Sequence, residues 1–324
     1  MKKFPLLLLC SLSLLLCLPT FAQVPTTAKI AFVSRGINPS GIYQSNIYMM
    51  NPDGSDLVNL ISKSRSRGIN HIAWEPSGQR ILFCSDHKGK HDIHIMNADG
   101  TDAKPVFTEP RYRVEPTWSP DGKRIAYVAS AQPMGRSLYI ASTNGQFGKS
   151  IVQVGIRGGQ PDWSPDGTEI VFVAASQGTR KIYILNLESH TQKQLLPDKN
   201  PWMQHPAWAP DGRRIAFVWS PNRSGTGIYL INRDGTGLKQ ITKPDPLRTL
   251  SIAWAPSGDE LVYAKDTRDS LHLFKVNLND QHVQQLTHEM LNSEAIWFDP
   301  AVTVSVEPSA FSLITTWGTV KNQN

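Results

Sequence analysis

Short runs of wholly apolar residues recur along this chain at nearly even intervals, and a polar turn precedes each of them. Five of these runs occupy residues 81–84, 125–128, 170–173, 215–218 and 261–264. They are rich in residues that favour strands, and the turns before them contain Pro and Gly. A run of this length that is apolar at every position indicates a strand buried on both faces.

A tryptophan precedes each of these runs, and the intervals between successive tryptophans are 43–46 residues: Trp74, Trp118, Trp163, Trp208, Trp254 and Trp297. The first five lead into Pro-Asp-Gly or Pro-Ser-Gly turns, in which Pro presets φ and Gly accepts a positive φ. A third and a fourth strand follow, for example at residues 182–185 and near residue 195. Four short strands in about 45 residues are typical of one blade of a β-propeller.

The two ends of the repeated region complete each other. Residues 30–33 form an apolar strand with no Trp strand before it, and the Trp strand at residues 294–297 has no strands after it. Pairing the two completes a blade and removes an open sheet edge. We therefore predict an all-β fold: a six-bladed β-propeller of four-stranded blades over residues 23–300, closed by pairing the C-terminal Trp strand with the three N-terminal strands.

The repeated turns carry a family resemblance. Trp-Ser-Pro-Asp-Gly at residues 118–122 and 163–167, with Asn-x-Asp-Gly at residues 51–54, 97–100 and 232–235, resembles the WD-repeat-like motif of the TolB-like six-bladed β-propeller family. The resemblance is to the propeller domain only, because the residues between Gln23 and Ile30 are too few for the α/β domain that precedes the propeller in TolB-type proteins. It implies the fold and says little about function.

The first 22 residues predict a signal peptide. Lys2 and Lys3 precede an apolar run over residues 6–18, which is too short for a retained span, and a cleavage site follows Ala22. No other run is long enough to cross a membrane, so we expect a periplasmic or secreted protein. Cleavage would leave Cys84 as the only cysteine, which excludes an internal disulfide. Residues 301–324 contain no repeat and form a C-terminal tail.

Common catalytic motifs are missing, since the sequence has no Gly-x-Ser-x-Gly elbow, His-Glu-x-x-His motif or phosphate-binding loop. The candidate site is the central channel, which each innermost strand enters three residues before its Trp. All six residues there are polar, and we predict that they form a ligand-binding ring at the channel mouth: His71, Glu115, Gln160, His205, Ser251 and Glu294. We expect no cofactor and no metal, because opposed histidines would lie too far apart to share an ion.

The charge is small in total and uneven in its distribution. The chain carries +6, or +4 without Lys2 and Lys3, which is too little for a nucleic-acid-binding protein. The loops predicted at the channel mouth hold 18 Lys and Arg against 10 Asp and Glu, a balance of +8. We expect this face to attract an acidic protein or an anionic envelope polymer through arginines that include Arg65, Arg67, Arg111, Arg113, Arg157 and Arg180.

These features predict an exported, non-catalytic binding or scaffold propeller that uses its Arg-rich channel mouth. The alternative is a polysaccharide lyase or hydrolase that acts on an acidic glycan at the same mouth. His71 or His205 would then be the base or a metal ligand, and an arginine would neutralise the uronate carboxylate. The resemblance adds to this alternative, because some six-bladed pectate-type lyases are similar to the family and use histidine on the channel face.

Overall fold

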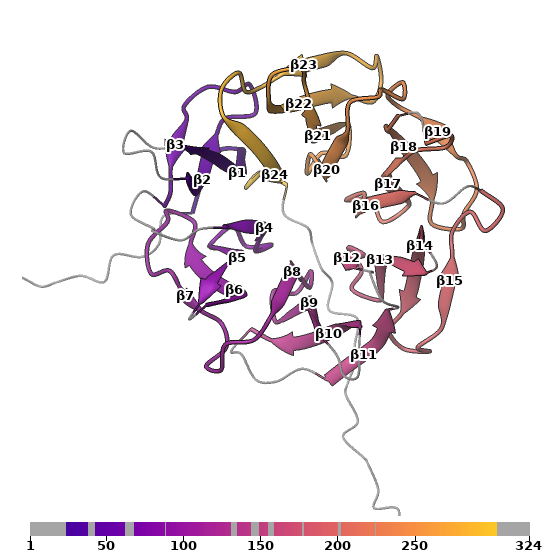
Figure 1. The fold of residues 1–324 in the computed structure, drawn as a ribbon, viewed down its shortest axis with the longest axis horizontal. Helices are drawn as coiled ribbons and strands as arrows, with labels where there is room; N and C mark the ends of the chain where they lie inside the picture. The colour runs from indigo at the N-terminus through magenta and orange to yellow at the C-terminus, as the bar shows by residue number, and fades with distance from the viewer. Residues whose placement is uncertain are drawn as a thin grey trace, which may run out of the picture.

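The repeats fold into six antiparallel sheets that stand around one axis, as a computed structural model of the chain shows (Figure 1). The structure describes residues 24–37, 43–61, 68–87, 89–130, 135–143, 149–154, 159–176, 178–199, 202–223 and 225–302. Every regular element within these ranges is a strand. The predicted all-β, six-bladed architecture is therefore confirmed.

Each blade has four strands, of which the first lies nearest the axis and the last lies at the rim (Figure 1). The first blade contains, in spatial order, β24 (Leu291–Phe298), β1 (Lys29–Ile37), β2 (Tyr43–Met50) and β3 (Val58–Asn59). The second contains β4 (Asn70–Trp74), β5 (Arg80–His87), β6 (Lys90–Asn97) and β7 (Lys104–Pro105). The third contains β8 (Arg113–Trp118), β9 (Arg124–Ser130), β10 (Arg136–Ser142) and β11 (Lys149–Val154).

The other three blades repeat this order. The fourth contains β12 (Gly159–Trp163), β13 (Glu169–Ser176), β14 (Thr179–Asn186) and β15 (Gln192–Gln194). The fifth contains β16 (Met203–Trp208), β17 (Arg214–Trp219), β18 (Gly227–Asn232) and β19 (Lys239–Gln240). The sixth contains β20 (Thr249–Trp254), β21 (Glu260–Asp266), β22 (Leu271–Asn277) and β23 (Val283–Gln285).

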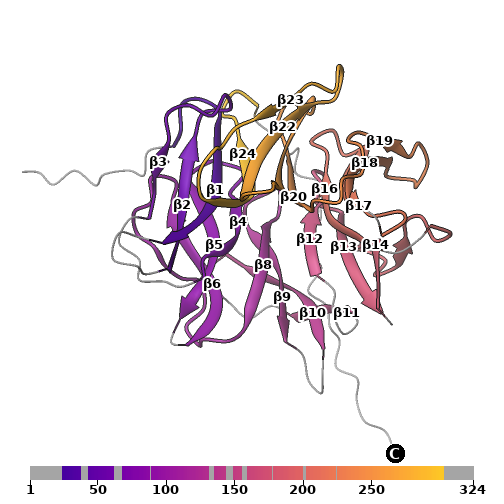
Figure 2. The ribbon, with the colours of Figure 1, turned by 45° about the horizontal axis from the view of Figure 1, so that its top comes forward.

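The first blade closes the ring, because its strands come from both ends of the repeated region. β24 runs antiparallel to β1, with Ile30 opposite Trp297 and Ala31 opposite Ile296. Figure 2 shows the yellow β24 beside the indigo β1. The predicted closure is confirmed. Since β24 also contacts β20 and β4, every blade has a neighbour on each side.

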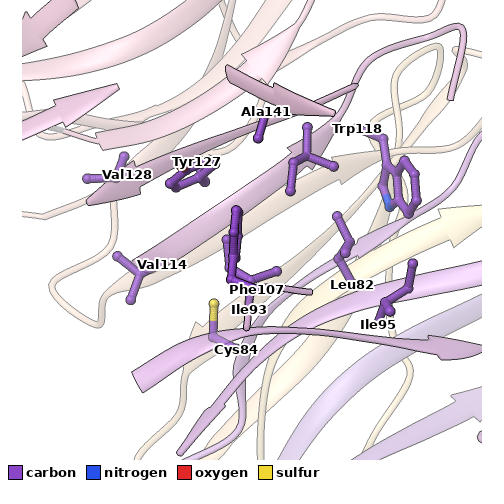
Figure 3. Packing of buried hydrophobic residues seen from close by; sticks show 11 residues of the cluster. Leu82, Cys84, Ile93, Ile95, Phe107, Val114, Trp118, Tyr127, Val128 and Ala141 are labelled. Atoms are coloured by element: carbon purple, nitrogen blue, oxygen red, sulfur yellow. The ribbon is translucent and has the colours of Figure 1, made fainter. Parts of the chain in front are cut away.

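The second strand of a blade is buried on both faces because each face contacts a different neighbour. In β5, Ile81 and Phe83 join a cluster with residues of the first blade. Leu82 and Cys84 point the other way and join residues of the third blade (Figure 3). All four are at most 4% exposed. The wholly apolar runs of the sequence are thus strands enclosed between blades.

The six repeat tryptophans are each covered by a cation or by an aromatic ring. Three of the cations are arginines at the start of a second strand, 4.9–5.2 Å from the indole centroid of the next blade: Arg80 over Trp118, Arg124 over Trp163 and Arg214 over Trp254. Such a cation–π contact stabilises the fold by about 0.5–2 kcal/mol, more when it is desolvated. The Trp strand and the arginine therefore join adjacent blades.

The fourth blade has Glu169 at the position of this arginine, and the cation that covers the next tryptophan comes from another element. Arg233, just after β18, lies 5.5 Å from the ring centroid of Trp208. Its guanidinium also donates to Glu169 (2.9 Å) and Asp166 (2.8 Å) across the blade boundary. The acid at the arginine position thus holds the cation that covers the next tryptophan.

The two remaining tryptophans, Trp297 and Trp74, are covered by a lysine and by an aromatic ring. Glu260 replaces the arginine in the sixth blade and pairs with Lys275 (3.2 Å), whose ammonium lies 5.9 Å from the ring of Trp297. Trp74 stacks on Phe298 of β24, with ring centroids 5.3 Å apart. Gly78, at φ 73°, is required beside them because a Cβ there would fall 2.1 Å from the Phe298 ring.

We predict that Arg233→Ala lowers the free energy of unfolding by about 2 kcal/mol, because it uncovers Trp208 and leaves the mostly buried Glu169 without its cation. Arg213→Ala is the matched control, since Arg213 is exposed in the neighbouring turn. We expect the control to change stability by less than about 0.5 kcal/mol. Urea unfolding measures both variants, and equal effects would contradict the role assigned to Arg233.

Candidate functional site

All six residues predicted for the channel mouth line one cavity of about 420 Å³ on the axis of the propeller. Each lies in the innermost strand of its blade, three residues before the tryptophan. The residues that follow in the same strands form the cavity wall, which extends to the turn prolines Pro76 and Pro210. The strand register therefore brings together residues that are far apart in the sequence.

Every ring residue has a left-handed backbone conformation, with φ between 41° and 57°. At this point each innermost strand breaks its pairing register with the second strand, as in a β-bulge. A residue other than glycine costs on the order of 1 kcal/mol or more in this conformation. Strain at six equivalent positions is therefore a built feature of the channel mouth. None of the six is glycine, so the residue types alone do not indicate this conformation.

The ring side chains bridge neighbouring blades by accepting hydrogen bonds from the backbone of the next ring residue. Among the described residues, four of the six boundaries carry such a bond: Gln160 N–H to Glu115 Oε2 (2.6 Å), His205 N–H to Gln160 Oε1 (2.7 Å), Glu294 N–H to Ser251 Oγ (3.1 Å), and His71 N–H to Glu294 Oε2. The bulge exposes the N–H, and the neighbouring side chain satisfies it. The ring is thus part of the contact between blades.

Glu115 reaches its partner because Gly159 leaves room for it. A Cβ on Gly159 would lie 2.0 Å from Glu115 Oε2, the oxygen that accepts from the Gln160 N–H. The other carboxylate oxygen, Oε1, lies 3.9 Å from His71 Nε2. Glu115 therefore links three consecutive blades at the mouth.

Asp162 is a further carboxyl one layer below the ring, and it also lines the cavity. It accepts hydrogen bonds from the Trp208 N–H (2.7 Å) and the Thr117 hydroxyl (3.4 Å). Enclosure by protein outweighs these bonds and raises the pKa of Asp162 to about 6. The sequence prediction missed this residue. The repeat contains a signal for it: four of the six residues directly before a repeat Trp are Ala or Ile, so an Asp at this position stands out.

The two ring histidines have different surroundings. Burial lowers the pKa of His205 to about 4, and the positive charges of His71 and Arg180 act in the same direction. The His205 imidazole is therefore neutral at pH 7, with Nε2 3.4 Å from Gln160 Nε2. His71 is partly exposed and faces the carboxylate of Glu115. Of the two imidazoles, that of His71 is the one that lies beside a carboxylate in the described structure, with Nε2 3.9 Å from Glu115 Oε1.

Three arginines of the outer strands surround the ring and contact either a ring residue or its neighbour in the innermost strand. These contacts are Arg35 to Glu294 (3.9 Å), Arg136 to Glu115 (3.9 Å) and Arg180 to Gln204 Oε1 (3.0 Å). Arg35 also donates to Ser293 Oγ (2.8 Å). We call Arg35, Arg136 and Arg180 the mouth arginines. They place guanidinium groups beside the polar ring.

Three of the six arginines predicted to bind a partner lie outside the described residues: Arg65, Arg67 and Arg157. Arg111 is exposed, and its guanidinium contacts Glu109 (3.2 Å). Arg113 differs from the prediction, because it is 2% exposed and pairs with the buried Asp92 (2.8 Å). It also stacks on Phe107, 4.0 Å from the ring centroid. A guanidinium enclosed in this way belongs to the interior and offers nothing to a partner.

Two exposed aromatic side chains beside the mouth arginines were also missed from the sequence. Tyr112 is 42% exposed, and its ring centroid lies 5.8 Å from the Arg136 guanidinium. Trp202 is 36% exposed and has two guanidinium groups over its ring, those of Arg180 and Arg223. Neither residue belongs to the repeat. For Trp202, its position outside the 43–46-residue spacing is the sequence feature that distinguishes it from the six repeat tryptophans.

In the part of the chain that the structure describes, no three or more His, Cys, Asp or Glu side chains are placed to share a metal ion. Within the same part, no helix has the length and apolar character to cross a membrane. Cys84 is buried, and its burial raises the pKa of the thiol well above the ordinary value. The polar side chains that line the cavity carry carboxyl, imidazole, amide and hydroxyl groups.

Comparisons with known proteins agree with this architecture. A family model described as the TolB beta propeller domain matches residues 16–134 and 92–304. The Tol-Pal system protein TolB of Alcanivorax borkumensis (strain ATCC 700651 / DSM 11573 / NCIMB 13689 / SK2) is 29% identical over 105 residues, which are 32% of this chain and 23% of that protein. The matched stretches span 10–23% of the length of the curated relatives.

Two solved structures show the same fold. TolB from Acinetobacter baumannii has a TM-score of 0.75 at 20% identity, over 83% of this chain and 66% of that chain. An oligogalacturonate lyase in complex with manganese has a TM-score of 0.50 at 16% identity, over 81% of this chain and 74% of that chain. At these identities the likeness concerns the fold alone.

We predict that Asp162→Asn changes how stability depends on pH. The pKa of Asp162 is raised from 3.8 to about 6, so its stabilising contribution is full below pH 3.8 and is lost as the pH rises through 6. The variant does not titrate in this range. Its free energy of unfolding relative to the wild type should therefore rise by about 2 kcal/mol between about pH 4 and pH 8. Urea unfolding of both proteins across this range measures the change.

His205 acts in the opposite direction, because its pKa is lowered and stability is lost as the pH falls from 6.5 through about 4. This contribution is the same in both proteins and cancels in their difference. Any loss of hydrogen bonding in the variant adds an offset that does not depend on pH. A difference that stays constant from acid to alkaline conditions would contradict the raised pKa.

Proposed function

This chain belongs to the TolB β-propeller domain family, and we propose that it is a non-catalytic binding module that holds an acidic partner protein at its channel mouth. The observation that carries the proposal is the ring of polar residues with left-handed backbones, with arginines beside it. Residues in strained conformations concentrate where structure is pre-organised for binding. The proposal includes export, through the signal peptide at residues 1–22, to the periplasm or the exterior.

The ring supports binding because its geometry is fixed before a ligand arrives. Gln160 is held at both ends, with its N–H bonded to Glu115 and its Oε1 bonded to the His205 N–H. A pre-organised group loses little freedom when it binds, so more of the contact energy appears as affinity. The cavity presents oxygen and nitrogen atoms from all six blades to one entering segment.

The mouth arginines support an acidic partner. Guanidinium groups form paired hydrogen bonds with carboxylates, and groups near a protein surface attract such partners over about a Debye length. Arg180 points its guanidinium at a neutral amide, that of Gln204, rather than at a carboxylate. Within the described residues no carboxylate pairs with its charge, which supports its availability to an incoming acid.

The family supports a role with other proteins. One relative is named as a Tol-Pal system protein, and the match with it covers 32% of this chain. An assembly with further envelope components is consistent with that name, and an anionic envelope polymer would satisfy the same charge pattern. We place the protein partner first because exposed aromatic and arginine side chains lie together at the mouth, a composition enriched at protein interfaces.

The second candidate is a lyase or hydrolase that acts on an acidic glycan at the mouth. The observation in its favour is the neutral imidazole of His205 near the Arg180 guanidinium, a base beside a group that binds carboxylates. A solved structure of the same fold is an oligogalacturonate lyase in complex with manganese. An activity assay separates this candidate from the first.

We predict that the tagged protein captures an acidic protein from an envelope extract at low salt and releases it at high salt. Arg136→Glu combined with Arg180→Glu should reduce capture at least about tenfold, because two attractive contacts become repulsive. Arg213→Glu is the matched control, since Arg213 lies in a turn at the opposite face and should leave capture unchanged. Quantitative mass spectrometry of the captured proteins measures the effect.

Two outcomes would contradict the proposal. Capture that is insensitive to salt, or equally reduced by Arg213→Glu, would reject the proposal that positive charge at the channel mouth attracts the partner. Degradation of oligogalacturonate by the wild type, abolished in His205→Ala, would reject the non-catalytic function and support the lyase or hydrolase. Circular dichroism of the variants establishes that each one keeps the propeller fold.

A further inference from the structure

Trp202 differs from the repeat tryptophans in exposure and in position. It lies in the segment that leads from the fourth blade into β16, at the face of the channel mouth. Its side chain is 36% exposed, whereas those of Trp118, Trp163, Trp208 and Trp254 are 4–6% exposed. No repeat element requires an indole here, so its presence needs a reason other than the packing between blades.

The backbone holds Trp202 in one place. Its N–H donates to the Arg180 carbonyl (3.0 Å), and its carbonyl accepts from the Ser220 N–H (3.2 Å). Arg180 is on β14 and Ser220 directly follows β17, so the residue is fixed between the fourth and fifth blades. Its φ is 93°, a conformation that bulky residues rarely adopt. Strain of this kind persists only where the surroundings fix it.

Two guanidinium groups lie over the exposed indole. The Cζ atoms of Arg180 and Arg223 are 5.9 Å and 5.4 Å from the ring centroid. Among the described residues, no carboxylate pairs with either guanidinium, and Arg180 donates instead to Gln204, the neighbour of His205 in the ring. We call Arg180, Trp202 and Arg223 the Trp202 cluster. It combines a fixed aromatic side chain with two positive charges that lack an acidic partner in the described chain.

Several other cations of the same face have an acid beside them. In the sixth blade, Arg248 pairs with Asp266 (2.8 Å) and Lys265 pairs with Asp245 (2.8 Å). Arg136, beside Tyr112, has Glu115 within 3.9 Å. Arg180 and Arg223 differ from these paired cations, and they lie together over one indole at the boundary of the fourth and fifth blades.

We infer that the Trp202 cluster is the anchor for a partner peptide segment that carries Asp or Glu side chains. This inference rests on the proposed function and gives it a location. Tryptophan and arginine are the residues that most often carry binding energy in protein interfaces. The guanidinium groups already lie over the indole, and their donors suit peptide carboxylates better than a stacked sugar ring. A segment held here reaches Gln204 and the ring directly.

The test uses the exported full chain and a fluorescent peptide of alternating Glu and Gly, with binding followed by anisotropy at low salt. Arg223→Gln and Trp202→Ala should each weaken binding at least about tenfold. Arg248→Gln, on the same face but paired with Asp266, is the matched control and should weaken it less than about twofold. Arg223 is exposed, so its variant tests the cluster without a change to the fold.

A second readout locates the peptide directly. The indole N–H resonance of Trp202, assigned by its loss in Trp202→Phe, should shift on addition of the peptide. Peptide binding that is weakened equally by Arg248→Gln would keep the acidic-partner proposal and reject the Trp202 cluster. Absence of peptide binding to the wild type would reject both. Binding of oligogalacturonate in place of the peptide, with the same dependence on Arg223, would assign the cluster to a glycan.

Discussion

The pairing of β24 with β1 is the contact on which the rest of the propeller depends. Each blade buries apolar side chains on both of its faces, so a blade without a neighbour would expose one of them. β24 supplies the innermost strand of the first blade, and its last residue, Phe298, covers Trp74 of the second. One strand therefore completes a sheet and joins two blades. A linear array of the same repeats would lack all of these contacts.

The same closure maintains the channel mouth. Glu294 belongs to β24, where its N–H donates to Ser251 and its carboxylate accepts from the His71 N–H. The closing strand thus connects the ring to the blade on each side of it. The left-handed backbones are unfavourable alone, and hydrogen bonds from the neighbouring blades compensate for them. Because these bonds run between blades, the ring geometry and the closure of the fold stabilise each other.

The sequence predicts the blades and the ring positions, which repeat, and misses the backbone conformation of the ring and the features that depend on a single contact. Trp74 and its five equivalents marked the blades, and the register before each Trp located the ring residues correctly on the channel. The left-handed conformation was missed because His, Glu, Gln and Ser carry no sequence signal for it. Arg113 is predicted at the surface because it lies in the segment that leads into a Trp strand, whereas the structure buries it against Asp92 and Phe107. A contact that occurs in one blade only produces no periodic pattern in the sequence.

Departures from the repeat therefore separate into two kinds. Glu169 and Glu260 replace an arginine, but each comes with a cation that restores the cover of a tryptophan, so these changes maintain the packing. Trp202 and Arg223 restore nothing of the kind: the indole remains exposed, and the cation over it has no acid within the described chain. The left-handed backbone of Trp202 is unfavourable, and the backbone hydrogen bonds and cations around it leave the indole partly exposed. A compensating contact from outside the chain accounts for this departure, which is why the binding surface is assigned to the boundary of the fourth and fifth blades.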